Sequence, residues 1–218
     1  GNDANLAGLA EHRYGAGRGC TDMVYITVST GIGGGVIVAD RMLLGRQGLA
    51  GEIGHVTIDI SAEDRGEVSI ATLEGLASGP NIARRARKAL AGGASSLVRQ
   101  RLNNDIAALT PKLLKEAAED GDAFSLHQFR IAGRYLGIGL VNLLHTFNPQ
   151  RFVIGGSIWM HCSPFMEETI WETIKERCNA PEYWRELEIV SAELGDDVGL
   201  LGAVALAVDG LEQAAGGA

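Results

Sequence analysis

The sequence predicts a mixed-sheet α/β domain, and three observations support this fold class. Apolar β-type runs at 23–26 and 36–38 flank a glycine-rich turn, which is typical of two antiparallel strands. The order strand, helix, strand, helix between 151 and 213 is typical of parallel strands joined by crossover helices. Helical patterns fill most of the chain between 70 and 147. Together these patterns predict one mixed β-sheet flanked by helices.

The first part of the chain should contain one helix and four short strands. Asn2 or Asp3 can cap a helix whose apolar spacing continues to about Tyr14, before the glycines within 15–19 end it. The strands expected after this helix are 23–26, 36–38, 42–44 and, by alternation of apolar and polar residues, 55–60.

The remainder should be mainly helical, with two further strands. The expected helices are 70–90 with a break at 78–80, 110–119, 122–147, 164–178 and 198–213, and the expected strands are 151–157 and 187–192. Thr110 and Asp122 are the expected caps. Glycines within 122–147 imply close packing against a sheet or another helix. The apolar helix 198–213 should pack in the core, and the basic run 84–88 is interpreted as a solvated helix face.

Composition limits the classes of protein to which the chain can belong. Its 218 residues carry a net charge of -8, which argues against a nucleic-acid surface as the main role of this segment. The longest charge-free stretch, 135–150, is too short and too polar to span a membrane. Cys20, Cys162 and Cys178 lie far apart without a C-x-x-C pair, which indicates free thiols and a reducing cytoplasm.

The glycine-rich loop at 27–35, T-V-S-T-G-I-G-G-G, is the first candidate for ligand binding. Glycines let a turn approach a ligand closely, Thr30 supplies a hydroxyl, and successive backbone N–H groups can bind a phosphate. The spacing is not G-x-G-x-x-G, and the chain contains no G-x-x-x-x-G-K-[ST], so neither a Rossmann site nor a Walker-A loop is implied. On these residues alone, a plain β-hairpin explains the loop equally well.

Other polar residues lie among glycines or at the ends of expected elements: Asn2, Asp3, Glu52, His55 and Glu74. Each has a structural explanation when taken alone. Asp3 can be only a helix cap, and Glu74 can be a solvated helix residue. Glu52 and His55 can be polar groups of a loop. Their order along the chain is more informative than any one of them.

Taken together, six segments resemble the ROK family (repressors, open reading frames and sugar kinases). They are N-D-A-N at 2–5, S-T-G-I-G-G-G-V at 29–36, G-L-A-G-E-I-G-H at 48–55, L-E-G-L-A-S-G at 73–79, F-N-P-Q-R-F-V-I-G-G at 147–156 and L-G-D-D-V-G-L-L-G-A at 194–203. The segments run through the whole chain in the family's order. The glycine hairpin followed by G-x-x-G-E-I-G-H is the most specific part of the match.

The resemblance implies an actin-like, ribonuclease-H-like ATPase fold, in which two lobes enclose a sugar and ATP. Residues 1–218 resemble the larger, C-terminal lobe. The family's N-terminal lobe carries an aspartate–glycine–glycine–threonine phosphate loop, and nothing in this sequence matches it. A complete kinase of this type is therefore expected to have an N-terminal lobe in addition to these residues, and this chain alone is not expected to be an active kinase.

The resemblance also assigns residues to the sugar. Asp3 matches the family's catalytic base, which accepts the proton of a sugar hydroxyl as that hydroxyl attacks the γ-phosphorus. Asn2 matches a ligand of a neighbouring sugar hydroxyl. Glu52, His55 and Glu74 match residues that hydrogen-bond the remaining hydroxyls. The implied substrate is a hexose or amino-hexose, and the same residue set serves glucose, fructose, mannose and N-acetylated sugars in the family.

The nucleotide site is assigned in the same way. Thr30, Gly31 and Gly33 match the second phosphate-binding loop, and Gly155 and Gly156 match the turn where adenosine lies close to the backbone. The implied cofactors are ATP and the Mg²⁺ that accompanies it. The family resemblance further implies a homodimer.

One departure from the family concerns zinc. Many members hold a structural zinc with one histidine and three cysteines, just before the glutamate of the L-E-G-L motif. Here Arg65, Glu67 and Thr72 occupy the cysteine positions, and His55 alone cannot hold a tetrahedral zinc. No structural zinc is therefore expected, and packing and salt bridges should hold this segment. Stoichiometric zinc in protein purified without added metal would contradict this expectation.

Three functions fit these residues. The first is an ATP-dependent hexose kinase of the glucokinase type, which the retained Asp3 and glycine loop favour. The second is the effector-sugar-binding lobe of a ROK transcriptional repressor, whose DNA-binding helix-turn-helix would lie upstream. The third is a non-catalytic sugar-binding homologue, which only the lost cysteines favour.

Overall fold

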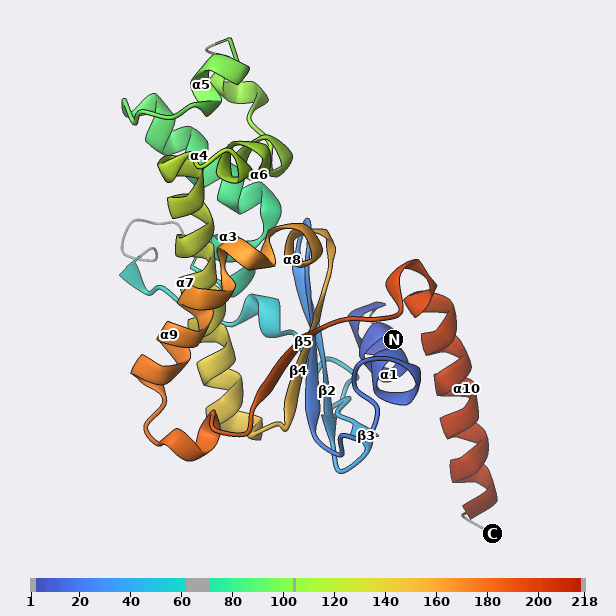
Figure 1. Cartoon of the computed structure of the whole chain (residues 1–218). Helices are drawn as coiled ribbons and strands as arrows, with labels where there is room; N and C mark the ends of the chain where they lie inside the picture. Colours follow the sequence, from blue (N-terminus) through green and yellow to red (C-terminus); the bar gives the residue numbers. More distant parts are fainter. Residues whose placement is uncertain (1–2, 62–70, 104, 217–218) are drawn as a thin grey trace.

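A five-stranded mixed sheet forms the centre of the computed structural model, which describes residues 3–61, 71–103 and 105–216 (Figure 1). The strands are β1 (Met23–Val28), β2 (Ile32–Val38), β3 (Arg41–Met42), β4 (Arg151–Gly155) and β5 (Glu188–Ser191), in the order β3-β2-β1-β4-β5. β2 pairs antiparallel with β1 and β3, whereas β4 pairs parallel with β1 and β5. The predicted mixed sheet is therefore confirmed.

The register brings two strand ends together. Val28 pairs with Ile32 across the β1–β2 hairpin, so residues 29–31 form the turn. In the parallel β1–β4 pair, Thr27 lies beside Gly155. The carboxyl ends of β1 and β4 therefore meet at one end of the sheet, which is where open α/β sheets generally bind ligands.

Nine labelled α-helices surround the sheet within the described residues. They are α1 (Asp3–Tyr14), α3 (Leu73–Ala77), α4 (Gly79–Ala91), α5 (Val98–Arg101), α6 (Pro111–Glu119), α7 (Ala123–Phe147), α8 (Ser157–Cys162), α9 (Glu167–Arg177) and α10 (Val198–Gly216). Short 3₁₀ helices are η1 (Ile53–His55), η3 (Ile106–Ala108), η4 (Ser163–Phe165), η5 (Pro181–Tyr183) and η6 (Gly195–Asp197). The predicted caps are confirmed: Thr110 Oγ1 accepts from Leu113 N–H, and Asp122 Oδ2 accepts from Ser125 N–H.

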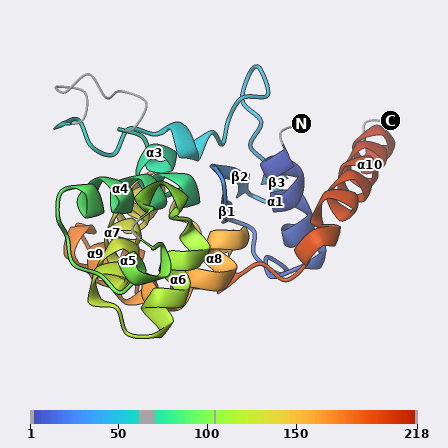
Figure 2. The same ribbon diagram turned by 90° about the horizontal axis from the view of Figure 1, so that it is seen from above.

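The helices form two unequal layers on the sheet. α1 packs on β1 and β2, and α10 packs on α1, whereas the helices from α3 to α9 lie on the opposite side (Figures 1 and 2). Alternate residues of β1 point to the two faces. Val24 and Ile26 belong to the larger apolar core, and Met23 and Tyr25 belong to the smaller core under α1.

The strand predicted at 55–60 is wrong. Among the described residues, this segment forms one β-bridge, between Thr57 and Thr72, and Ile60 is 72% exposed. Alternating residues favour an extended backbone, but a strand also needs a partner to pair with. Here the partner segment turns into α3 at Leu73, so the pairing ends after one bridge.

The helix predicted at 198–213 forms as α10, but it does not pack in the core. The backbone of Gly202 lies against Leu6 of α1, where an added Cβ would come within 2.4 Å of the Leu6 carbonyl oxygen. On its other sides the exposed apolar residues are Leu200 (70%), Val204 (46%), Leu206 (51%) and Val208 (39%). The helix is apolar around its circumference, and the described chain covers only the side toward α1. No helix among the described residues is long and apolar enough to cross a membrane.

The three cysteines are free, as predicted. Cys20 and Cys162 are buried, and Cys178 is half-buried. Burial raises the pKa of all three thiols, to about 11 for Cys162. The thiols therefore stay protonated at neutral pH, which makes them poor nucleophiles.

Candidate functional site

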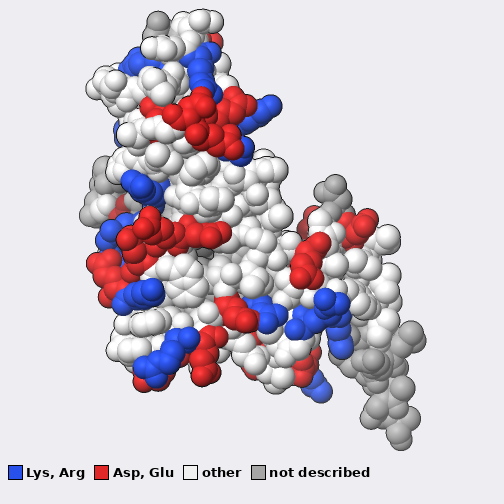
Figure 3. Space-filling view, in the orientation of Figure 1, with Lys and Arg blue, Asp and Glu red and all other residues white. Residues whose placement is uncertain are grey.

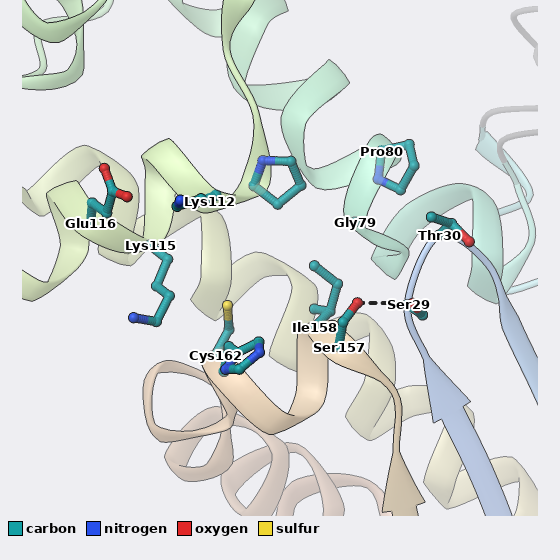
Figure 4. A pocket seen from close by; sticks show the side chains of 12 residues that line it. Ser29, Thr30, Gly79, Pro80, Lys112, Lys115, Glu116, Ser157, Ile158 and Cys162 are labelled. Carbon is teal, nitrogen blue, oxygen red and sulfur yellow. Dashed lines mark hydrogen bonds between the residues drawn. The ribbon is translucent and has the colours of Figure 1, made fainter. Parts of the chain in front are cut away.

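The β1–β2 turn, residues 29–31, is held from both sides. Ser29 N–H donates to the Gly31 carbonyl at 2.9 Å and closes the turn. Gly79 N–H, at the start of α4, donates to the Ser29 carbonyl at 2.9 Å. The hydroxyls of Ser29 and Ser157 hydrogen-bond at 2.9 Å (Figure 4). The turn is therefore tied to the first residues of both α4 and α8.

A cavity of about 500 Å³ lies beside this turn, at the carboxyl ends of β1 and β4 (Figure 4). Its walls come from the turn, α4, α6 and α8. The lining residues are Ser29, Thr30, Gly79, Pro80, Pro111, Lys112, Lys115, Glu116, Ser157, Ile158, His161 and Cys162. Pro80, Pro111 and Ile158 supply apolar surface, while Thr30 and Ser157 supply hydroxyls. This combination suits a ligand with one flat apolar part and one polar part.

The packing under the cavity requires Gly155 and Gly156. Gly156 has a φ of 86°, and a Cβ there would lie 2.5 Å from the Val28 carbonyl oxygen. A Cβ at Gly155 would lie 2.9 Å from Tyr25 Oη. These glycines let β4 follow β1 to the cavity and let α8 begin there. They do not themselves line the described cavity, and the adenosine contact expected for them stays a prediction.

Glu74 reaches the same turn from α3. Its Oε2 accepts from Ile32 N–H at 2.9 Å, and a Cβ at Gly31 would lie 2.6 Å from that oxygen. Thr72 caps α3 by accepting from Gly75 N–H at 3.1 Å. Gly31 therefore leaves the space in which the carboxylate approaches the turn, and the predicted sugar ligand Glu74 contacts the predicted phosphate loop.

Glu52 directly precedes the short helix η1, which packs on β2, and His55 is the last residue of that helix. His55 Nε2 lies 3.9 Å from Glu52 Oε2, and both side chains are exposed. Ile53 lies between them and packs on the bare backbone of Gly34, where a Cβ would come within 2.4 Å of Ile53 Cδ1. The glycines of β2 thus allow the segment that carries both polar residues to lie directly on the sheet.

Asp3 is exposed in the first turn of α1, and this end of the helix also lies on β2. A Cβ at Gly33 would come within 3.0 Å of Ala4 Cβ, next to Asp3. Gly33 therefore serves the close approach of α1, while its predicted phosphate contact stays a prediction. Asn2, the other residue expected here, lies outside the described residues.

Four segments that are distant in sequence therefore meet around β2: the start of α1, the turn 29–31, residues 51–55 and the start of α3. Asn5 is buried where two of them touch, with its Oδ1 3.4 Å from the position that a Cβ at Gly51 would occupy. Within the described part of the chain, Oδ1 of Asn5 has no hydrogen-bond partner. Asn5 is not among the predicted site residues, because a single Asn in a helix carries no local signal.

Of the residues that line the cavity, only Thr30 is a predicted site residue. Ser29 and Ser157 could have been predicted from their positions. Ser29 directly follows β1 and Ser157 lies two residues after β4, and α/β ligand sites form at such strand ends. Lys115 and His161 come from helices without a recognisable motif. Only the packing of α6 and α8 brings them to the cavity.

The described residues show no metal centre: in 3–61, 71–103 and 105–216, no three His, Cys, Asp or Glu side chains gather as possible ligands. Arg65 and Glu67, two of the residues in the cysteine positions, lie outside this part of the chain. The third, Thr72, is the cap of α3. The absence of a structural zinc stays a prediction.

Comparison with known proteins agrees with this geometry. Residues 1–209 match the family model of the ROK family. A glucokinase from Halalkalibacterium halodurans is 35% identical over 205 residues, which are 92% of this chain and 60% of the glucokinase.

Two solved structures share the fold. A ROK family glucokinase from Streptomyces griseus, in complex with glucose and AMPPNP, superposes with a TM-score of 0.77 at 29% identity, over 94% of this chain and 66% of that protein. A ROK family transcriptional regulator, a homologue of the E. coli MLC protein, gives a TM-score of 0.80 at 26% identity, over 93% of this chain and 50% of the regulator. The predicted actin-like ATPase fold is confirmed, and the chain spans about half to two thirds of these relatives.

Proposed function

The chain belongs to the ROK family, and on that premise we propose that it supplies the sugar site, the catalytic base and part of the ATP site of a glucokinase-like hexose kinase. One observation carries the proposal. Glu74 binds the N–H of Ile32, directly after the β1–β2 turn, and that turn lines the cavity at the carboxyl ends of β1 and β4. A sugar held by Glu74 would therefore be adjacent to phosphates held by the turn.

The cavity fits a nucleotide. Pro80, Pro111 and Ile158 can cover the faces of a flat base. The hydroxyl of Thr30 and the backbone N–H groups of the glycine turn suit phosphate oxygens. ATP with Mg²⁺ would supply the transferred phosphoryl group and neutralise its charge. The relative from Streptomyces griseus was solved with AMPPNP and glucose together, which supports this assignment.

The sugar would lie between α1, η1 and α3. Glu52, His55 and Glu74 would orient its hydroxyls, since carboxylates and imidazole can pair with the donors and acceptors of a hexose or amino-hexose. Asp3 would accept the proton of the attacking hydroxyl. Asn2 is proposed as a further sugar ligand. Thr30 and the turn would hold the phosphates in line with that hydroxyl.

The complete kinase is proposed to have a further, N-terminal lobe and to form a homodimer. The chain covers 60% of the related glucokinase, and the exposed apolar side of α10 is suited to contact with another folded unit. On the face seen in Figure 3, acidic side chains gather over α6 and α9, with Lys and Arg between them. This face does not resemble a nucleic-acid surface, in keeping with the net charge of -8.

A second candidate is the effector-binding lobe of a ROK repressor. The observation that favours it is the high TM-score with the ROK transcriptional regulator. Such a lobe needs the sugar site but has less need of a base or a nucleotide cavity. A non-catalytic sugar-binding homologue is the third possibility, and it shares the same test.

The test is sugar-dependent release of ADP by the natural protein that contains these residues. We expect ADP release in the presence of ATP, Mg²⁺ and one of glucose, fructose, mannose or N-acetylmannosamine. Asp3→Asn should lower kcat by about 10²–10⁴-fold, the usual contribution of a general base, with little change in the Kd for the sugar. Asp105→Asn is the matched control, because Asp105 is exposed and does not line the cavity.

The outcomes separate the candidates. Unchanged turnover in Asp3→Asn would exclude Asp3 as the base. Sugar binding without ADP release, combined with sugar-dependent release of DNA, would favour the repressor. Sugar binding with neither response would favour the non-catalytic homologue.

A further inference from the structure

Three side chains of α4 bind three successive carbonyl groups of α3, the short helix that carries Glu74. Asn81 Nδ2 donates to the Glu74 carbonyl at 3.1 Å. Arg84 donates from an Nη to the Gly75 carbonyl at 3.1 Å. Arg85 donates from Nη1 to the Leu76 carbonyl at 2.7 Å. We call Asn81, Arg84 and Arg85 the α4 clamp.

We propose that the α4 clamp positions the Glu74 carboxylate and so determines the affinity for the sugar, with Arg85 as its main positioning residue. This proposal rests on the proposed function, because it takes Glu74 as a sugar ligand. The contacts of the arginines in this segment show that the prediction of a solvated helix face at 84–88 is wrong. Arg84 is exposed but bonded to α3, Arg85 is half-buried, and Arg87 donates to the Leu109 carbonyl at 2.8 Å.

α3 needs external support because it is short. It has five residues, and isolated helices of this length are not stable in water. Thr72 caps its first turn, and Ser78 N–H donates to the Glu74 carbonyl at 3.1 Å. The Gly75 and Leu76 carbonyls receive no backbone N–H from the next turn, because Gly79 N–H donates to the Ser29 carbonyl and Pro80 has no N–H. The clamp supplies donors to these carbonyls, and its two guanidinium charges lie at the end of the helix that favours cations. Without the clamp, the Gly75 and Leu76 carbonyls would lose these donors, and the direction of α3 would be fixed less firmly.

Arg85 connects α3 to α7, the longest helix among the described residues. Its Nη2 donates to the Gln128 carbonyl at 2.9 Å, and its Nε to Gln128 Oε1 at 3.3 Å. Gln128 is buried in α7, a helix of 25 residues. The three oxygens that Arg85 binds are uncharged. Burial lowers the pKa of Arg85 to about 10, so the guanidinium stays charged at neutral pH.

The position of α3 is transmitted directly to the candidate site. Glu74 lies in the first turn of α3, and its Oε2 accepts from Ile32 N–H at 2.9 Å, next to the phosphate turn. The space for this contact exists because Gly31 lacks a Cβ. A small rotation of α3 would therefore move the carboxylate away from both the turn and the sugar. The nucleotide cavity contains none of the α4 clamp residues, so its affinity should be much less sensitive.

The experiment compares Arg85→Met and Arg85→Lys with Arg87→Met in the natural protein. Arg87 is the matched control, because it lies on the same helix and also donates to a carbonyl, but that carbonyl belongs to Leu109 rather than to α3. Binding of glucose, fructose, mannose and N-acetylmannosamine is measured by calorimetry, together with binding of AMPPNP. We expect Arg85→Met to weaken sugar binding at least tenfold and AMPPNP binding less than twofold. Arg85→Lys should recover part of the loss, and Arg87→Met should change neither affinity.

Any binding result other than a selective loss of sugar affinity in Arg85→Met overturns the proposal. Unchanged sugar affinity in Arg85→Met, or equal loss of both affinities, would show that Arg85 has no specific role at Glu74. If Arg85→Met does not fold, Asn81→Ala replaces it. This change removes the bonds of the Asn81 side chain to the Glu74 carbonyl, to Ser78 Oγ and from Arg84 Nε, and unchanged sugar affinity there has the same meaning. If the unaltered protein binds none of the four sugars, the proposed function fails, and the clamp proposal fails with it. The unaltered protein and the variants thus report the two failures separately.

Discussion

Asp122 shows at the scale of one residue how a buried carboxylate connects separate segments. It accepts hydrogen bonds from the N–H and the hydroxyl of Ser125, from the hydroxyl of Ser96 at 2.7 Å and from Leu97 N–H at 3.0 Å. Burial alone would raise the pKa of this carboxyl, but the hydrogen bonds outweigh burial and bring the pKa below its ordinary value of 3.8. The charged form therefore stabilises the folded state.

The stabilisation by Asp122 should depend on pH. Because the folded-state pKa is lower than the unfolded-state pKa, the contribution is fully present above the unfolded pKa and is lost as pH falls through the folded pKa. We expect Asp122→Ala to lower the free energy of unfolding by about 2 kcal/mol at pH 7, through loss of the cap and of its other bonds. The difference from the unaltered chain should shrink below about pH 4.

Urea denaturation at pH 7 and at pH 3 measures this difference. Asp105→Ala is the control, since Asp105 is exposed and makes no side-chain cap bond at the start of η3. A cost for Asp122→Ala that is the same at both pH values would contradict the role of the charge.

Sequence reasoning at this scale succeeds where the partners are local. Asp122 could be predicted because a cap bonds to the next turn of its own helix. Glu11 could not be predicted, although it is completely buried and accepts from the N–H groups of Ala16, Glu193 and Leu194. Two of these partners are more than 180 residues away in sequence. In the sequence it is one polar residue of a predicted helix, and only the fold identifies it as a link between α1 and the segment before α10.

At the scale of elements, α7 confirms the inference drawn from its glycines. A Cβ at Gly133 would lie 2.8 Å from the Met166 carbonyl oxygen, and one at Gly137 would lie 2.7 Å from Thr173 Cβ. Both contacts are with α9 or the residue before it. The glycines therefore reduce helix propensity but allow the two helices to approach closely.

Gly133→Ala should consequently destabilise the protein, against the usual preference of helices for alanine. Helix propensity favours Ala by about 1 kcal/mol, but a methyl group placed 2.8 Å from a backbone oxygen forces α9 to move, so we expect a net loss of about 1–3 kcal/mol. Gly199→Ala on α10 is the matched control, because nothing lies within 4 Å of its Cβ position, and it should raise stability slightly. Thermal unfolding of both variants gives the comparison, and a stabilised Gly133→Ala would disprove the packing argument.

The elements that sequence reasoning missed are those that depend on a partner. Residues 55–60 have the alternation of a strand but only one bridging residue opposite them. The sequence predicts a strand over 151–157, but β4 ends at Gly155 and α8 begins at Ser157. The long helices and the β1–β2 hairpin were predicted because their periodicity is independent of distant contacts.

At the scale of the whole molecule, the exposed side of α10 bears on the proposed N-terminal lobe. In the 218-residue chain, Leu200→Gln combined with Val204→Gln should change the free energy of unfolding by less than about 0.5 kcal/mol, because both side chains are already exposed. In the natural protein with a lobe covering this side, the same pair should cost more than about 2 kcal/mol.

Urea denaturation of the two proteins distinguishes these cases. Ala205→Gln is the positive control in the 218-residue chain, since Ala205 is 1% exposed and the larger polar side chain cannot fit. Equally small effects of the double substitution in both proteins would mean that no lobe covers this side of α10.

The set of site residues could be predicted only from the family resemblance, because periodicity does not identify them. The residues predicted from the resemblance approach one another because the glycines of β2 admit α1 and η1, and Gly31 of the turn admits Glu74 of α3. Pattern analysis finds the glycines but cannot say what occupies the space that they leave. The roles of Asp3, Glu52, His55 and Glu74 stay predictions.

The parallel pairing of β1 with β4 also shapes how the protein is made. Residues 29–150 separate the two strands, so the β1–β2 hairpin leaves the ribosome long before its second neighbour exists. At about 5–20 residues per second, β1 waits on the order of ten seconds with one edge unpaired and with Val24 and Ile26 uncovered. Such an edge is a template for aggregation. Codon changes that slow translation of this interval should therefore reduce the yield of soluble protein while leaving the folded molecule unchanged.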